Sequence, residues 1–138
     1  MTQRTPMRER IPARRIQLKR AYLPAAATDG MRILVDRLWP RGIRKSAAAI
    51  DFWIKDLAPS TALRKWFGHE PARWSEFRRR YSAELRDHRD RLAELRALTR
   101  RKTVTLVFAA HDERHNDAVV LREVLLGRRG SQGDRACR

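Results

Sequence analysis

The sequence predicts an α/β fold: a small single domain with a short, mostly parallel sheet and helices packed on both faces. Two short apolar runs rich in β-branched residues, at 32–36 and 103–110, are typical of strands buried on both faces. A long helical stretch separates them, so the connection is expected to be a right-handed crossover between parallel strands. With 138 residues, the chain is long enough for one hydrophobic core.

The domain is expected to span residues 15–126, between a disordered basic tail at 1–14 and a second disordered tail at 127–138. The net charge of +16 favours an anionic partner. However, residues 1–20 alone carry seven Arg or Lys against one Glu, and the last twelve residues carry four against one Asp. Because much of the excess lies in the tails, the charge alone does not define a binding face.

The first half of the domain combines strands, turns and short helices. Residues 16–22 largely alternate between apolar and polar side chains and predict the first strand. Residues 51–57 predict a short helix. A second helix is expected at 62–67, where Ser60 or Thr61 can cap its start.

A long amphipathic segment follows Pro71. Its apolar side chains are spaced by three or four residues, which places them on one helical face. One unbroken helix would be roughly 40 Å long, too long for so small a domain. A break is therefore expected near residues 87–90, with Asp87 capping the second helix. The positions on this face are Trp74, Phe77, Tyr81, Leu85, His88, Leu92 and Leu95.

Polar residues follow both buried strands of the predicted sheet. The first run ends at Asp36, and the second leads through residues 111–117 into a last helix. Because the carboxyl ends of parallel strands meet at one edge of a sheet, these residues are expected to come together there. The residues expected at this edge are Asp36, Arg37, Trp39, Arg41, His111, Asp112, His115 and Asn116.

Two arginines at this edge, Arg37 and Arg41, are suited to hold a phosphate, a carboxylate or a nucleic-acid backbone, because guanidinium groups bind such anions through paired hydrogen bonds. The alternative is that Asp36 pairs with one of them in a surface ion pair of small energetic value. Trp39, between the two arginines, either stacks on a base or substrate or packs within the fold.

His115 is the candidate acid or base of this edge, with its ring oriented by Asp112 or Asp36. In that case, Asn116 contributes to ligand binding. The alternative is structural, because His115 and Asn116 lie where the last helix begins and are placed to cap it.

The composition argues against several other kinds of site. His111 and His115 are spaced like a metal-binding pair, but the segment lacks the rest of such a motif, so we expect no metal and no cofactor. Cys137 is the only cysteine, which excludes a disulfide framework and fits a cytoplasmic protein. No apolar run is long enough to span a membrane, and no membrane partner is expected.

Several motifs follow one another along the chain: LVDRLWPRG, WIKDLAPS, LRKWFGHEP, RWSEFRRRY and LVFAAHDERHNDAVVL. With them, the chain resembles domain-of-unknown-function family 488 (DUF488), in its YeaO-like branch, over residues 16–125. The resemblance implies a small bacterial α/β cytoplasmic protein with no established reaction. Relatives in the wider family often carry a Cys-His-Arg element after the last strand. The corresponding residues here are His115, Asn116 and Asp117, so thiol chemistry is not expected to carry over.

The function expected from these residues is binding of an anion at the strand edge: a nucleotide, a phosphorylated metabolite or a nucleic-acid end. The alternative is a non-catalytic nucleic-acid-binding module that uses the basic face of the long helical segment and the two tails.

Overall fold

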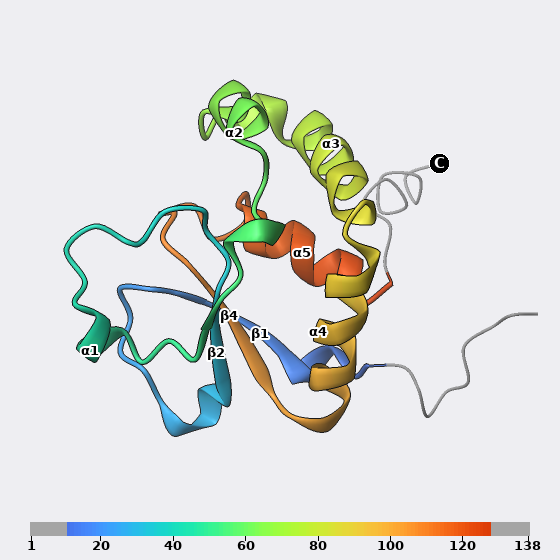
Figure 1. Cartoon of the computed structure of the whole chain (residues 1–138). Helices are drawn as coiled ribbons and strands as arrows, with labels where there is room; N and C mark the ends of the chain where they lie inside the picture. Colours follow the sequence, from blue (N-terminus) through green and yellow to red (C-terminus); the bar gives the residue numbers. More distant parts are fainter. Residues whose placement is uncertain (1–10, 128–138) are drawn as a thin grey trace, which may run out of the picture.

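A four-stranded parallel sheet forms the centre of residues 11–127, the part of the chain that the computed structural model describes (Figure 1). The strands are β1 (Ile16–Arg20), β2 (Met31–Leu34), β3 (Phe52–Trp53) and β4 (Val104–Phe108). Their order in the sheet is β1-β4-β2-β3, and every pairing is parallel. The prediction of a small α/β domain with a mostly parallel sheet is therefore confirmed.

Five α-helices belong to the described residues: α1 (Lys45–Ala48), α2 (Thr61–Phe67), α3 (Trp74–Arg86), α4 (Arg89–Arg101) and α5 (Asp117–Leu125). On one face of the sheet, α5 packs directly on β4 and β1, and α3 and α4 pack on α5. The short helix α1 and the loops between the strands lie on the other side of the sheet (Figure 1). The two faces are covered unequally, because the long connection between β3 and β4 takes its helices to a single face.

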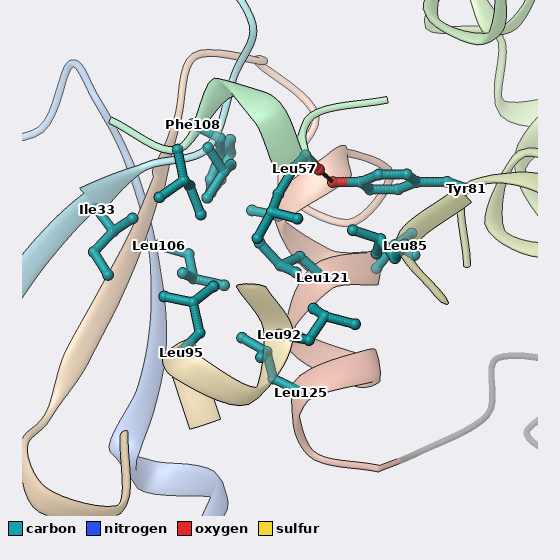
Figure 2. Packing of buried hydrophobic residues seen from close by; sticks show 14 of the residues in the cluster. Ile33, Leu57, Tyr81, Leu85, Leu92, Leu95, Leu106, Phe108, Leu121 and Leu125 are labelled. Atoms are coloured by element: carbon teal, nitrogen blue, oxygen red, sulfur yellow. Dashed lines mark hydrogen bonds between the residues drawn. The ribbon is translucent and has the colours of Figure 1, made fainter. Parts of the chain in front are cut away.

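β4 contributes to both sides of the core, because its side chains alternate between the two faces of the sheet. Val104 and Leu106 belong to the larger hydrophobic cluster, under the helices, and Val107 belongs to a smaller cluster on the other face. Figure 2 shows Ile33 and Leu106 on the sheet side of the larger cluster and Leu121 on the side of α5. The continuous apolar runs of the sequence thus correspond to strands that are buried on both faces.

A buried ion network joins the loops of the smaller face. Asp29 and Arg32 are 3% and 4% exposed, and Arg32 Nη1 lies 2.7 Å from Asp29 Oδ2. Lys19 Nζ lies 3.0 Å from Asp29 Oδ1, and Arg32 Nη2 donates to the Ala48 carbonyl oxygen at 2.9 Å. Burial by itself raises the pKa of Asp29, but hydrogen bonds from the Ala26 N–H, Lys19 and Arg32 hold that pKa below its ordinary value. The network fastens α1 and the β1–β2 connection to the sheet.

The prediction of a helix at 51–57 is wrong. This stretch forms β3, followed by a 3-10 turn at Lys55–Leu57. Phe52 and Trp53 pair in parallel with Ile33 and Leu34 of β2. Aromatic side chains are well suited to strands, and a free strand edge overrides the weak helical preference of a short segment.

The long amphipathic segment is broken where the sequence predicts, between α3 and α4. Asp87, however, does not cap α4. His88 occupies the capping position without a side-chain hydrogen bond, and Asp87 continues the helical conformation of α3. The start of α2 is capped as predicted, because Ser60 Oγ accepts the Leu63 N–H at 3.2 Å.

Of the predicted N-terminal tail, residues 11–14 are described. Ala13–Arg15 form a 3-10 turn, and Arg122 donates to the Ala13 carbonyl oxygen at 2.9 Å. Residues 1–10 and 128–138, with Cys137, lie outside the described residues. None of the helices in the described part of the chain has the length and apolar character needed to cross a membrane.

Candidate functional site

The carboxyl ends of β2 and β4 lie side by side. The Val35 N–H donates to the Val107 carbonyl oxygen at 3.1 Å, which continues the strand pairing beyond β2. Asp36 Oδ2 then accepts the Ala109 N–H at 2.9 Å. The Asp36 side chain therefore joins the two segments that follow the buried strands.

Asp36 also meets a second carboxyl group, that of Asp117, the first residue of α5. Each of these two partly buried carboxyl groups affects the pKa of the other. Burial is the largest cause that raises the pKa of both groups, and the charge of Asp36 raises the pKa of Asp117 further, well above its ordinary value. The charge of Asp36 thus disfavours ionisation of Asp117.

The proximity of Asp36 and Asp117 is not predictable from the sequence. Asp117 is one of several acidic residues between β4 and the last helix, and a carboxylate near a helix N-terminus is common. Its partner lies at the end of β2, far away in the sequence. Only the docking of α5 against the strand ends brings the two groups into contact.

Two cationic side chains from outside the predicted site act on Asp36. Burial raises the pKa of Asp36, whereas the charges of His69 and Arg64 oppose that shift. Arg64 lies on α2 and His69 follows it, in a left-handed backbone conformation with a φ of 58°. Both side chains are exposed. The local sequence indicates only an ordinary surface helix here, so it offered no signal for their proximity to the strand ends.

Arg37 lies on the same side of the molecule. Its Nε and Nη2 atoms donate to the Pro59 carbonyl oxygen at 3.3 and 3.2 Å. Burial raises the pKa of Tyr81 well above its ordinary value; the charges of Asp117 and Asp36 add to this shift, and that of Arg37 opposes it. Arg37 therefore lies near the Tyr81 hydroxyl.

His115 is held by Asp112, one of its two predicted partners. His115 Nδ1 lies 2.8 Å from Asp112 Oδ2, and the His115 backbone N–H donates to Asp112 Oδ1 at 3.0 Å. The contact with His115 is the main cause that lowers the pKa of Asp112. The imidazole also packs edge-on against Trp74, with ring centroids 5.0 Å apart. These contacts set the ring orientation and leave Nε2 as the ring nitrogen for an external partner.

His115 and Arg37 lie against the same helix but at different levels. His115 contacts Trp74 at the start of α3, whereas Arg37 lies near Tyr81, two turns further along. Two turns of α-helix rise about 10 Å. Arg37 and His115 therefore lie near residues of α3 that are about two turns apart.

Asn116 has a structural role. Its side-chain oxygen accepts the Val119 N–H at 3.1 Å, and its Nδ2 donates to the Asp112 carbonyl oxygen at 2.9 Å. The residue is buried. Both the oxygen and the nitrogen of its side-chain amide are thus hydrogen-bonded within the protein, as expected if the residue caps α5.

Two other predicted residues do not join the carboxyl pair. Trp39 packs edge-on against Trp53, with centroids 5.5 Å apart, and its Nε1 donates to the Ile43 carbonyl oxygen at 2.7 Å. The Arg41 side chain is exposed, and its carbonyl oxygen accepts the Tyr22 hydroxyl at 2.8 Å. Within residues 11–127, the Arg41 guanidinium makes no hydrogen bond or ion pair with the other predicted site residues. Trp39 belongs to the smaller core cluster instead.

His111 faces a different partner from His115. Its Nδ1 lies 3.5 Å from Arg20 Nη2, at the end of β1, whereas the other histidine is bound to Asp112. The i, i+4 spacing therefore does not place the two rings in one site. Across the described ranges, no three His, Cys, Asp or Glu side chains gather in an arrangement that would hold a metal ion.

The fold and this edge define a small α/β protein with a parallel sheet and a polar loop at the carboxyl ends of its two inner strands. The chain belongs to the family DUF488-N3i, described as the inactive DUF488-N3 subclade, whose model matches residues 15–137.

Two similar proteins carry names that describe them as uncharacterised. YeaO of Escherichia coli (strain K12) is 46% identical over 110 residues, which cover 80% of this chain and 96% of YeaO. A protein of Mycobacterium tuberculosis (strain H37Rv) is 46% identical over 114 residues, or 83% of this chain and 96% of the relative. No solved structure matches the chain significantly. The resemblance to DUF488 and its YeaO-like branch is confirmed.

Proposed function

We propose that this protein binds an anionic group without catalysing a reaction, at the carboxyl ends of β2 and β4. The anion would be the phosphate of a nucleotide, of a phosphorylated metabolite or of a nucleic-acid end. The observation that carries the proposal is the convergence of cations from separate segments: Arg37 after β2, Arg64 on α2 and His69 after α2. Guanidinium groups suit such ligands because they bind oxyanions through paired hydrogen bonds.

The raised pKa of the two carboxyl groups supports attraction of an anion. Burial raises the pKa of both Asp36 and Asp117, so ionisation of both groups together is disfavoured. The charge of Arg64 acts on Asp36 and that of Arg37 on Tyr81, which supports a positive potential in this region.

A neighbouring carboxylate, Glu84 of α3, is already engaged elsewhere. Its two oxygens accept the Ser60 N–H at 2.8 Å and the Ser60 hydroxyl at 2.7 Å. Both contacts lie at the start of α2. Glu84 thus serves to fasten α2 to α3, and this supports Arg64, which is exposed, as a group available to a ligand.

Two observations support binding without catalysis. The family to which the chain belongs is described as inactive. In addition, the residues that correspond to the Cys-His-Arg element of the wider family have structural tasks here, since Asn116 caps α5 and Asp117 pairs with Asp36. We therefore assign His115 and Asp112 to shaping the loop and contacting the bound anion, in place of acid–base chemistry.

The alternative function, nucleic-acid binding by the basic helical face, has less support. Several arginines of that face are engaged within the fold. Arg78 lies 3.1 Å from Glu123, and Arg79 is paired with Glu76. Arg96 donates to backbone carbonyl oxygens at the end of α5. A face whose arginines already have partners offers less charge to a phosphate backbone.

Titration with inorganic phosphate and with adenosine monophosphate, followed by backbone amide NMR, tests the proposal. The shifts are expected to cluster at residues 36–37, 64–69 and 109–117. Arg64→Gln should weaken binding about tenfold to a hundredfold, because a charge-assisted hydrogen bond contributes about 1.5–3 kcal/mol. Arg86→Gln is the matched control: this arginine is exposed at the end of α3, and the variant should bind as the wild type does.

The absence of shifts in these three segments at millimolar ligand would refute the proposed site. Equal weakening by both variants, together with a steep loss of affinity as salt is added, would instead favour the nucleic-acid alternative, in which binding depends on total positive charge.

A further inference from the structure

We propose that the side of the sheet that carries α1 and the loops binds single-stranded nucleic acid. The residues that carry this inference are called the loop surface below; they are Tyr22, Trp39, Arg41, Lys45, Trp53 and Lys55. The inference goes beyond the proposed function, because it holds whether or not an anion binds at the ends of β2 and β4. It also uses none of the arginines on the helical face.

Two lysines of the loop surface lie on two tryptophan rings that contact each other. Lys45 Nζ lies 5.9 Å from the centre of the Trp39 ring, and Lys55 Nζ lies 4.4 Å from that of Trp53. The two rings pack edge-on, with centroids 5.5 Å apart. An aromatic face attracts an ammonium group and leaves N–H donors on its other side for a phosphate. Cations that are held in this way lose less freedom when they bind an anion.

Tyr22 supplies an exposed ring beside these cations. The residue is 46% exposed, and its hydroxyl donates to the Arg41 carbonyl oxygen at 2.8 Å. The Arg20 guanidinium lies 5.2 Å from the ring centre and is itself bound to the Ala110 carbonyl oxygen at 2.8 Å. The ring is therefore held from two sides while much of it faces solvent. Bases of a single strand stack on aromatic rings that are presented in this way.

The three cations of the loop surface are available to a partner. All three are exposed, and across residues 11–127 none of them forms an ion pair. The two carboxylates next to β3 are engaged, since Asp51 Oδ2 accepts the Arg32 N–H and Asp56 Oδ2 lies 2.8 Å from Arg91 of α4. The loop surface thus keeps a positive charge for an anionic partner.

The two tryptophans favour a nucleic acid over a lipid surface. Trp39 Nε1 donates to the Ile43 carbonyl oxygen and Trp53 Nε1 to the Asp36 carbonyl oxygen, both at 2.7 Å. Both rings also pack against the smaller core cluster, so they are not free to enter a lipid headgroup layer as anchoring tryptophans do. A single strand, unlike a duplex, presents unstacked bases to Tyr22 together with its phosphates.

Fluorescence anisotropy of a labelled oligothymidylate of about 12 nucleotides, with the full chain, tests the proposal. The double variant Lys45→Gln/Lys55→Gln should bind about tenfold more weakly in about 50 mM salt. Its plot of log K against log salt should be less steep by about 1.4, because each phosphate contact of a single strand contributes about 0.7 to the slope.

The double variant Arg86→Gln/Arg89→Gln is the matched control. It removes the same charge from two exposed positions, at the end of α3 and the start of α4, and should bind as the wild type does. Equal weakening by the two double variants would show that binding follows total charge and would overturn the proposal.

Tyr22 is tested separately. Tyr22→Ala should weaken binding about fivefold to a hundredfold without changing the salt slope, because a stacked base is lost and no charge is removed. Tyr22→Phe keeps the ring, loses only the hydroxyl contact with Arg41, and should bind as the wild type does. Equal losses in Tyr22→Ala and Tyr22→Phe would overturn the role of the ring.

The absence of oligonucleotide binding at low salt would overturn the proposal as a whole. Binding to phosphatidylglycerol vesicles without binding to the oligonucleotide would also overturn it, and would assign the loop surface to a membrane. The phosphate titration at the strand ends is a separate measurement, which Lys45→Gln/Lys55→Gln should leave unchanged. Failure of either proposal is therefore visible without the other.

Discussion

Substitution of Gly30 by alanine should destabilise the protein strongly. Gly30 precedes β2 with a φ of 65° and a ψ of −136°, a conformation that residues with a side chain rarely adopt. A Cβ at this position would lie 2.2 Å from the Thr103 carbonyl oxygen. The same oxygen accepts the Met31 N–H at 3.0 Å. The backbone that leads into β4 therefore occupies the space that a side chain would need.

Two effects contribute to the expected loss. Holding a residue with a side chain in this backbone conformation costs about 1–3 kcal/mol. The clash is with backbone atoms, so a side-chain rotation cannot relieve it. A shift of β2 or β4 is needed instead, and it adds about 1–3 kcal/mol, the usual cost of inserting extra atoms into a packed core. Together they predict a loss of about 2–6 kcal/mol, a large part of the total stability of a domain of this size, which is about 5–15 kcal/mol.

Gly42→Ala provides the matched control. Gly42 also has a positive φ, of 82°, but nothing lies within 4 Å of a Cβ built there. This variant keeps the conformational cost without the clash and should lose only that cost, about 1–3 kcal/mol. Urea unfolding followed by tryptophan fluorescence measures both variants. Equal losses for the two glycines, or a Gly30→Ala protein within about 1 kcal/mol of the wild type, would refute the role given to the close approach of Thr103.

Two further predictions concern stability. Asp29→Asn should lose about 3–5 kcal/mol at neutral pH, because Arg32 and Lys19 then lack their carboxylate in a buried position. The pKa of Asp29 is lower in the folded state, so its stabilisation is fully present above the ordinary carboxyl pKa of about 3.9 and is lost as the pH falls through the lowered value. Urea unfolding at a series of pH values should therefore show the difference between variant and wild type shrinking in acid, and a difference that stays constant throughout would contradict this account. Asn116→Ala should lose about 1–2 kcal/mol through removal of the α5 cap, and a loss below about 0.5 kcal/mol by the same assay would argue against the capping role.

The sequence by itself determined the features that arise from near neighbours in the chain. The central strands β2 and β4 follow from apolar runs that suit burial on both faces, whatever partner they meet. The Ser60 cap and the break between α3 and α4 follow from local hydrogen bonding and helix length. The adjacency of the segments after β2 and β4 follows from the parallel crossover, which orients both strands alike.

Only the tertiary structure decided which polar groups meet. β3 exists because β2 offers a free edge, and no local pattern in two residues specifies that pairing. The contact between Asp36 and Asp117, and the proximity of Arg64 and His69 to it, depend on how α2 and α5 dock on the strand ends. Periodicity and capping depend on residues that are a few positions apart in the sequence. The charge and protonation of a site depend instead on the distances between separate elements, and those distances are set by how the elements pack.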